Sequence, residues 1–208
     1  MSPAWIDHWE RRAGFLAMPG LAMFLAGMNA VVGVLTLVRP EFPARLYLEP
    51  AALLAGEVWR SVTFLFIPPP TAPLWLAVWV LMIYSLMGML ERTLGEFRFT
   101  LYLLVGAAAT SLAALASGLS LSSGPLQLSV FLAFAHLHPE LEVRLFFILP
   151  VKVRWLAVAG WVYAAGNLAW GDAFTRIGLL SGLANYAVFF AAEHTSDWRG
   201  ALRRRRPR

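Results

Sequence analysis

The chain has 208 residues, of which 59% are hydrophobic and only 14% are charged, and its formal net charge is +5. This composition is typical of integral membrane proteins and excludes an ordinary soluble domain. The chain contains no cysteine, so disulfides, thiolate metal sites and cysteine nucleophiles are excluded as well.

Six apolar stretches follow one another along the chain, and we predict a membrane-spanning helix in each. A helix that crosses the hydrocarbon core needs about 20 apolar residues, and four of the stretches come close to that length. The stretches are 20–38, 73–90, 99–118, 126–138, 155–170 and 175–192. The predicted fold class is therefore an all-α membrane protein, a bundle of six transmembrane helices.

The fourth stretch is unusually short, because only 13 residues separate Pro125 from Pro139. As a helix it would extend over about 20 Å, which is less than the roughly 30 Å of the hydrocarbon core. We therefore predict that the fourth helix is central, surrounded by the other five. Its outer end, near Gly124, should lie below the membrane surface.

The predicted spans divide the chain into a cytoplasmic N-terminal segment, 1–19, one membrane domain, 20–193, and a basic cytoplasmic tail, 194–208. No cleavable signal peptide is expected, since the first apolar stretch is a full span preceded by several charges. The loop 39–72 is too apolar for a solvated linker, and we expect short helices at the membrane interface there. Residues 151–155 alternate apolar and basic side chains, which favours a segment along the cytoplasmic interface.

Lysine and arginine gather on one side of the predicted membrane. That side holds Arg11, Arg12, Arg92, Arg98, Arg144, Lys152, Arg154, Arg199, Arg203, Arg204, Arg205, Arg206 and Arg208, and the other holds Arg39, Arg45, Arg60 and Arg176. The positive-inside rule then places both termini in the cytoplasm. The arginine tail would anchor this topology and attract anionic headgroups, so the expected partner of the positive charge is membrane lipid and not nucleic acid.

Three motifs occur in order along the chain. The first loop contains Trp59-Arg60, and the end of the second span contains Gly88, Glu91, Gly95 and Arg98. The third motif runs from Pro139 to Leu156. Together they resemble the rhomboid superfamily, including derlins, over about residues 50–193. The resemblance implies a six-span core with a short fourth helix, and we expect a multi-pass protein of a bacterial inner membrane.

A rhomboid protease uses a serine at the start of span 4 and a histidine in span 6, helped by two polar residues of span 2. When the catalytic positions of a rhomboid protease are fitted to this sequence, the nucleophile position falls on Gly124, with Ser123 beside it, and the histidine position falls on Leu179. The span 2 positions become Leu76 and Val80. A serine needs a nearby base, and the histidines are all predicted on the cytoplasmic side, away from Ser123. They are His8, His136, His138 and His194. The Ser–His dyad is therefore absent.

The remaining residues of the motifs have structural interpretations. Gly88 and Gly95 would let helices approach closely, and Gly178 and Gly182 would do the same in span 6. Arg60 and Glu91 are charges near the membrane that need partners or interfacial water.

Polar side chains inside the predicted spans also favour structural roles. Asn29, Asn167 and Asn185 are expected to form hydrogen bonds between helices. His136 and His138 lie two residues apart and would point in different directions on a helix. We therefore predict no metal site and no cofactor.

Three hypotheses on function follow. The first is a catalytically inactive rhomboid-like protein, for which the resemblance to derlins implies binding or chaperoning the transmembrane segments of client proteins, with local bilayer thinning. The second is an active intramembrane serine protease that uses Ser123. The third, a small transporter, is disfavoured because the spans carry no buried acidic or basic pair and no repeated halves.

Overall fold

The computed structural model describes residues 10–69, 72–145 and 149–191, and it contains a helix in every one of the six apolar stretches. The predicted tail, 194–208, and the residues His8 and His194 lie outside the described residues. The main helices are α2 (Leu21–Val38), α5 (Pro73–Leu94), α6 (Glu96–Ser117), α7 (Gly124–Leu137), α8 (Val153–Trp170) and α9 (Ala173–Gly182), after which residues 184–191 are helical again.

Short elements fill the long loop and the connection before α8. The loop contains η2 (Phe42–Arg45), α3 (Pro50–Leu54), α4 (Arg60–Thr63) and η3 (Phe64–Phe66), and η1 (Gly14–Leu16) precedes α2. An antiparallel hairpin of β1 (Glu142–Leu145) and β2 (Leu149–Lys152) pairs Glu142 with Lys152. Residues 151 and 152 end the strand β2, in keeping with their alternating side chains, and α8 begins at Val153. The interfacial location predicted for 151–155 stays a prediction.

Four helical segments are long and apolar enough to cross a membrane: Glu10–Val38, Pro73–Leu94, Glu96–Ser117 and Ala173–Ala191. The helix α7 is apolar but has only 14 residues, as the interval between the two prolines predicts. The protein is thus a mostly helical, multi-pass membrane protein. The count of six spans stays a prediction.

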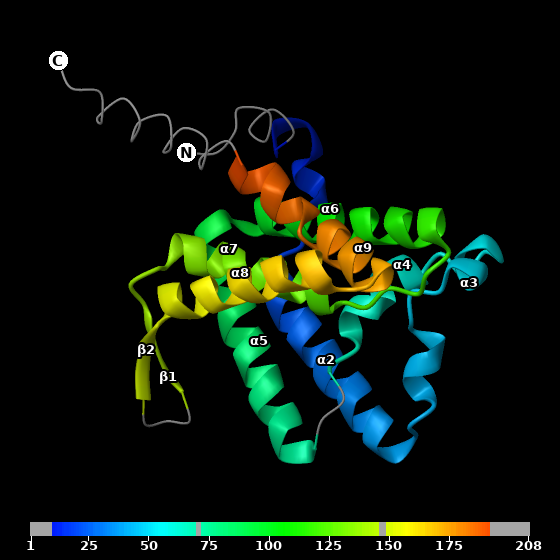
Figure 1. The fold of residues 1–208 in the computed structure, drawn as a ribbon, viewed down its shortest axis with the longest axis horizontal. Helices are drawn as coiled ribbons and strands as arrows, with labels where there is room; N and C mark the ends of the chain where they lie inside the picture. Colours follow the sequence, from blue (N-terminus) through cyan, green and yellow to red (C-terminus); the bar gives the residue numbers. More distant parts are fainter. Residues whose placement is uncertain (1–9, 70–71, 146–148, 192–208) are drawn as a thin grey trace.

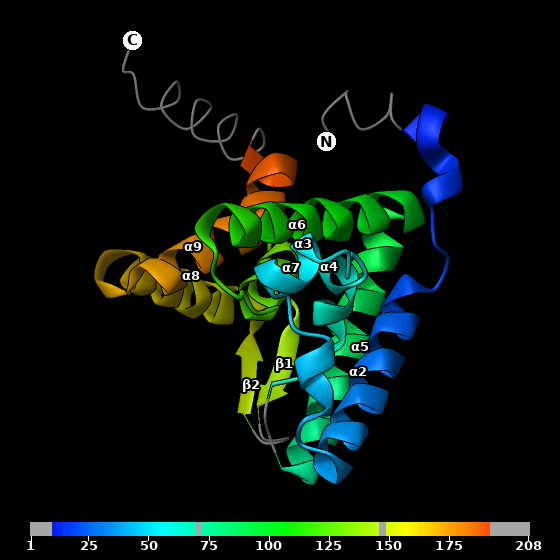
Figure 2. The same cartoon turned by 90° about the vertical axis from the view of Figure 1, so that its right-hand side faces the viewer.

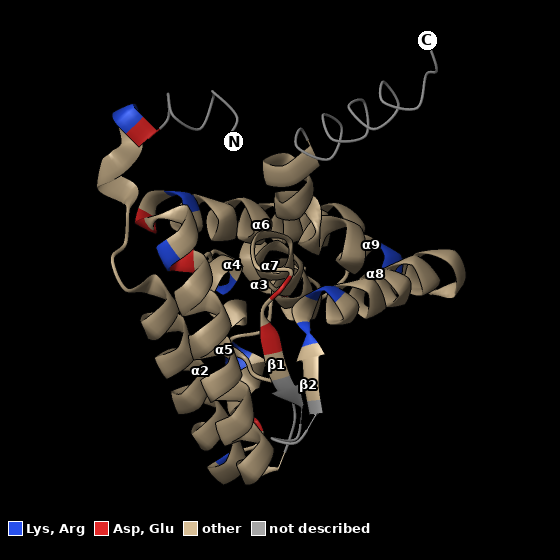
Figure 3. Cartoon of the chain, turned by 90° about the vertical axis from the view of Figure 1, so that its left-hand side faces the viewer, with Lys and Arg blue, Asp and Glu red and all other residues tan. Residues whose placement is uncertain are grey.

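The helices do not lie parallel to one another. In Figures 1 and 2, α2 and α5 form an antiparallel pair, while α6 and α8 run across the direction of that pair. The helix α2 contains no charged residue, and in α5 only Glu91 and Arg92, near its end, are charged. Figure 3 shows these charges at the end of the pair, next to those of α6 and the N-terminal helix.

The short helix α7 lies in the interior and packs against α5, α8 and α9. Of its 14 residues, Gly124 is the only exposed one. A polar network joins α7 to α6 and to residues 184–191. The hydroxyl of Tyr102 donates a hydrogen bond to the carbonyl oxygen of Ser129 (2.9 Å). The side-chain amide of Asn185 donates one to the carbonyl oxygen of Tyr102 (3.3 Å). Tyr102, Ser129 and Asn185 are fully buried.

Three glycines from three different helices face α7. A Cβ atom at Gly182 of α9 would lie 2.5 Å from Cβ of Pro125, and one at Gly106 of α6 would lie 2.8 Å from Cδ1 of Leu126. At Gly160 of α8 the same atom would lie 3.4 Å from the side chains of Leu128 and Leu132. The backbone of α9 therefore approaches that of α7 more closely than a larger residue would permit, while at Gly106 the backbone of α6 meets the ends of side chains.

Gly88 and Gly95 do not have the role predicted for them. A Cβ atom at either position would meet nothing within 4 Å, so neither glycine brings helices together. Gly95 instead adopts φ = +85° in the turn between α5 and α6, a conformation that favours glycine. Gly178 also has room, since its Cβ would lie 3.8 Å from Leu121 and Pro125.

Glu91 and Arg60 satisfy backbone groups that would otherwise lack partners. The carboxylate of Glu91 accepts hydrogen bonds from the amides of Leu21 (2.9 Å) and Ala22 (3.2 Å), and so caps the start of α2 from α5. The guanidinium of Arg60, only 8% exposed, donates to the carbonyl oxygens of Ala44 (3.0 Å) and Tyr47 (3.1 Å). Arg60 thereby holds the long loop together.

The three asparagines differ in their contacts. Asn29, almost fully buried, donates to the carbonyl oxygens of Leu25 and Leu65, and so links α2 to η3. Asn185 binds α6, as described above. Asn167 donates only to the carbonyl oxygen of Tyr163 in its own helix and is not the interhelical group that we predicted.

Close packing at Gly182 makes a first prediction. Gly182→Ala should lower the free energy of unfolding by about 1–3 kcal/mol, because the added methyl group overlaps Pro125 and the backbone of Leu126. The matched control is Gly178→Ala, one turn earlier in α9, which should be neutral or slightly stabilising. Equal effects of the two variants on unfolding in mixed micelles would contradict the packing described here.

The cap of α2 makes a second prediction. Glu91→Ala should lower the free energy of unfolding by about 1–2 kcal/mol, since two amides at the start of α2 lose their acceptor. Glu41→Ala is the control, because this exposed carboxylate makes no side-chain hydrogen bond in the described structure. Thermal unfolding in detergent measures both, and a Glu91 variant as stable as the Glu41 variant would show that the cap is unimportant.

Candidate functional site

The start of α7, where a rhomboid nucleophile would lie, is bordered by three cavities, one of which lies between α7 and α9. The largest of the three, of about 370 Å³, lies between α5 and α7, and we call it the α5–α7 groove. It is lined by Pro69, Trp79, Met82, Ile83, Leu86, Met87, Gly124, Gln127, Leu128, Val130 and Phe131. The second, of about 300 Å³, lies under the long loop and shares Pro69, Gly124 and Gln127 with the groove. The walls of the groove are apolar except for Gln127.

The long loop is tied to this end of α7. Leu48 and Leu121 form an isolated antiparallel bridge, and both are buried. The carbonyl oxygen of Ile67 accepts a hydrogen bond from Ser123 (3.5 Å), and Ile67 and Pro68 line the second cavity. Trp59 of the loop motif lies on the outer surface and is 54% exposed. Arg60 beside it is the residue that orders the loop.

Ser123 has no base beside it. Its hydroxyl donates to Ile67 and accepts from the side-chain amide of Gln127 (3.2 Å), and Ser123 itself is only 7% exposed. A carboxamide cannot take up a proton at neutral pH, so Gln127 cannot activate the hydroxyl. Within the described residues, Ser123 has the surroundings of a structural hydroxyl.

The fitted protease positions come together only in part. Gly124 and Leu179 line one cavity of about 300 Å³ between α7 and α9, which is where a serine and a histidine would have to meet. Leu76 lies elsewhere, buried against Gly33 of α2, and Val80 is half-buried on α5. Glycine and leucine carry no group that can act as a nucleophile or transfer a proton, so this arrangement has no acid–base chemistry.

The described histidines lie at the other end of α7. The ring of His136 packs against Phe190 with centroids 5.0 Å apart, and Nε2 of His138 lies 2.9 Å from the hydroxyl of Thr93. His136 is 13 residues from Ser123, about 20 Å along a helix. No group of three potential metal ligands occurs in the described parts of the chain.

Charged residues near this end of α7 form ion pairs between neighbouring segments. Glu140 accepts from Lys152 (2.9 Å) and Arg154 (2.8 Å), and the hydrogen bond from Lys152 lowers the pKa of the Glu140 carboxyl below its usual value. Arg98 of α6 binds Glu10 of the N-terminal helix at 3.1 Å. These ion pairs join neighbouring segments and face no cavity that we describe.

Gln127 is the residue of the groove that we did not single out in the sequence. The signal was present, since a glutamine inside an apolar stretch requires a polar partner or a functional reason. Its neighbours in the groove, such as Met82 and Met87, could not have been recognised, because nothing in an apolar stretch distinguishes a cavity wall from the rest of a helix face.

Comparisons with known proteins agree with the motifs. No curated protein matches the chain. The model of the Der1-like family matches residues 18–203, a range that includes the groove, the capped start of α2 and the end of α7. Der1-like proteins are part of the rhomboid-like superfamily and are generally catalytically inactive. The match covers most of the chain, and the protein therefore belongs to the Der1-like family.

Proposed function

We propose that this protein is a catalytically inactive rhomboid-like membrane protein that binds the transmembrane segments of other membrane proteins in the α5–α7 groove. One observation carries the proposal: an apolar groove adjoins the position of the lost nucleophile, while Ser123 beside it has no base. The fold thus retains a surface beside helices α5 and α7 without the chemistry of a protease.

The lining of the groove supports a helical client. Helices in a membrane associate by close packing and by a few hydrogen bonds, since lipid supplies no hydrophobic driving force between them. Met82 and Met87 offer flexible side chains that adapt to different partners, and Gln127 offers one hydrogen-bonding group. A client helix with small or weakly polar residues would match these features.

The two other hypotheses have less support. An active protease using Ser123 would need a base that the described surroundings of this residue do not contain. A transporter would need ionisable groups along its spans, and α2 has none. We also infer that both termini are cytoplasmic, that the membrane domain comprises 20–193 and that the membrane is a bacterial inner membrane, as the charge distribution and the resemblance suggest.

Crosslinking in liposomes tests the groove directly. A photoreactive residue at Met82, which is 42% exposed and lines the groove, should form adducts with a co-reconstituted single-span membrane protein. The same residue at Leu112 of α6, which is 66% exposed and lines no described cavity, should form few. Leu128→Trp should reduce the Met82 adducts several-fold by filling the groove. Equal yields at Met82 and Leu112 would reject the groove as a binding site.

Serine chemistry is tested separately. The purified protein should neither react with a fluorophosphonate probe nor cleave a rhomboid-type substrate, because the hydroxyl of Ser123 has no general base, and Ser123→Ala should leave both results unchanged. A rhomboid protease treated in parallel controls for the probe and the substrate. Labelling that is lost in Ser123→Ala would establish the active-protease hypothesis and contradict our proposal.

A further inference from the structure

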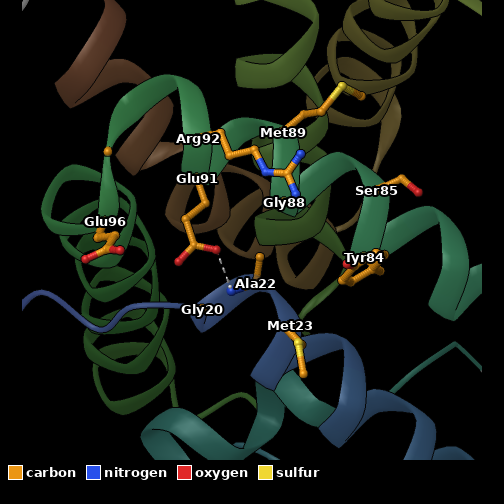
Figure 4. A pocket seen from close by; sticks show the side chains of 11 residues that line it. Gly20, Ala22, Met23, Tyr84, Ser85, Gly88, Met89, Glu91, Arg92 and Glu96 are labelled. Carbon is orange, nitrogen blue, oxygen red and sulfur yellow. Dashed lines mark hydrogen bonds between the residues drawn. The ribbon is translucent and has the colours of Figure 1, made fainter.

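A further and larger cavity, of about 690 Å³, lies between the start of α2 and the end of α5, away from the groove. Figure 4 shows it bordered by Gly20, which precedes α2, by Ala22 and Met23 of α2, by residues of α5 and by Glu96 at the start of α6. We call it the end cavity. Its volume is within the range of small-molecule sites in proteins, about 300–1,000 Å³.

Small residues keep the end cavity open. Tyr84, Gly88 and Arg92 are spaced by four along α5, so they lie on one face of that helix. A Cβ atom at Gly88 would meet nothing within 4 Å, and the same is true of Gly20. The face of α5 between Tyr84 and Arg92 therefore has no side chain that covers it.

Three charged side chains line the cavity, those of Glu91, Arg92 and Glu96, and in Figure 4 the carboxylate of Glu96 lies beyond Glu91, away from the guanidinium of Arg92. The carboxylate of Glu91 is held by the amides of Leu21 and Ala22 at the positive end of α2. Arg92 makes no hydrogen bond or ion pair with any described residue. In Figure 4 its guanidinium points along α5 toward the Tyr84 side of the cavity. The phenol of Tyr84, 45% exposed, is likewise without a described hydrogen-bond partner.

The cavity lies where lipid headgroups would be. Arg92 follows the uncharged part of α5, and α2 begins directly beside it with 18 residues that carry no charge. Below the cavity the two helices present strongly exposed apolar side chains, among them Met23 (68% exposed) and Leu81 (63% exposed). The charged end of the cavity thus adjoins an apolar surface, as a molecule with a charged head and hydrocarbon chains requires.

We propose that the end cavity binds the phosphodiester group of a membrane phospholipid. The guanidinium of Arg92 receives the phosphate oxygens, the phenol of Tyr84 donates a further hydrogen bond, and the acyl chains lie along the exposed apolar sides of α2 and α5. Gly88 leaves the space for the headgroup. The site is independent of the α5–α7 groove and of any client that binds there.

Lipid titration of the delipidated, full-length protein tests this proposal, with short-chain phosphatidylglycerol followed by native mass spectrometry. Arg92→Gln should weaken the binding of the first lipid by about tenfold, because a charge-assisted hydrogen bond is lost. Gly88→Leu should abolish that binding by filling the cavity, while the protein stays folded, since open space surrounds the new side chain. Thermal unfolding in detergent confirms the folded state.

The matched control is Arg39→Gln, which removes the same charge at the opposite end of α2, where the arginine lines no described cavity. It should leave the first binding event unchanged. Equal losses in Arg92→Gln and Arg39→Gln would mean that lipid is attracted by general charge alone and would overturn the proposal. Unchanged binding in Gly88→Leu would do the same, and so would equal binding of a diacylglycerol that lacks the phosphate.

Discussion

The packing of other helices onto α7 is the constraint on which the rest of the structure depends. Gly106, Gly160 and Gly182 belong to three different helices, and each faces the side chains or the backbone of α7. A short helix cannot reach both surfaces of a membrane, so the polar backbone groups at its ends must be covered by protein or water. Because the hydrophobic effect does not drive helices together in lipid, the packing of helices around α7 depends on close van der Waals contact. Glycine supplies that contact by removing the Cβ atom.

Backbone groups in an apolar environment create the second requirement. The first amides of a helix have no acceptor within that helix, and α2 begins with a glycine that offers no side-chain cap. Glu91 of α5 supplies the missing acceptor. Arg60 supplies a hydrogen-bond donor for carbonyl oxygens of the long loop. Two charges of the motifs thus make structural hydrogen bonds that do not depend on a catalytic dyad.

The helix α5 contributes to both candidate sites with different faces. Trp79, Ile83 and Met87 turn toward the groove, whereas Tyr84, Gly88 and Arg92 turn toward the end cavity. A client in the groove and a phospholipid in the end cavity would thus contact the same helix without competing for side chains. Variants of one face can test one site while leaving the other intact.

The sequence by itself determined the positions of the helices, the shortness of α7 and the loss of the dyad. Each of these follows from local information: apolar length, two prolines 14 positions apart, and the absence of histidine near Ser123. Only the tertiary structure decided that α6 and α8 cross the α2–α5 pair, that Glu91 caps α2 and that Gly88 opens a cavity where we expected close packing. It also decided that residues 142–152 form a hairpin. These features depend on contacts between residues distant in the chain, and an apolar stretch looks the same whether its neighbour is lipid, another helix or an empty space.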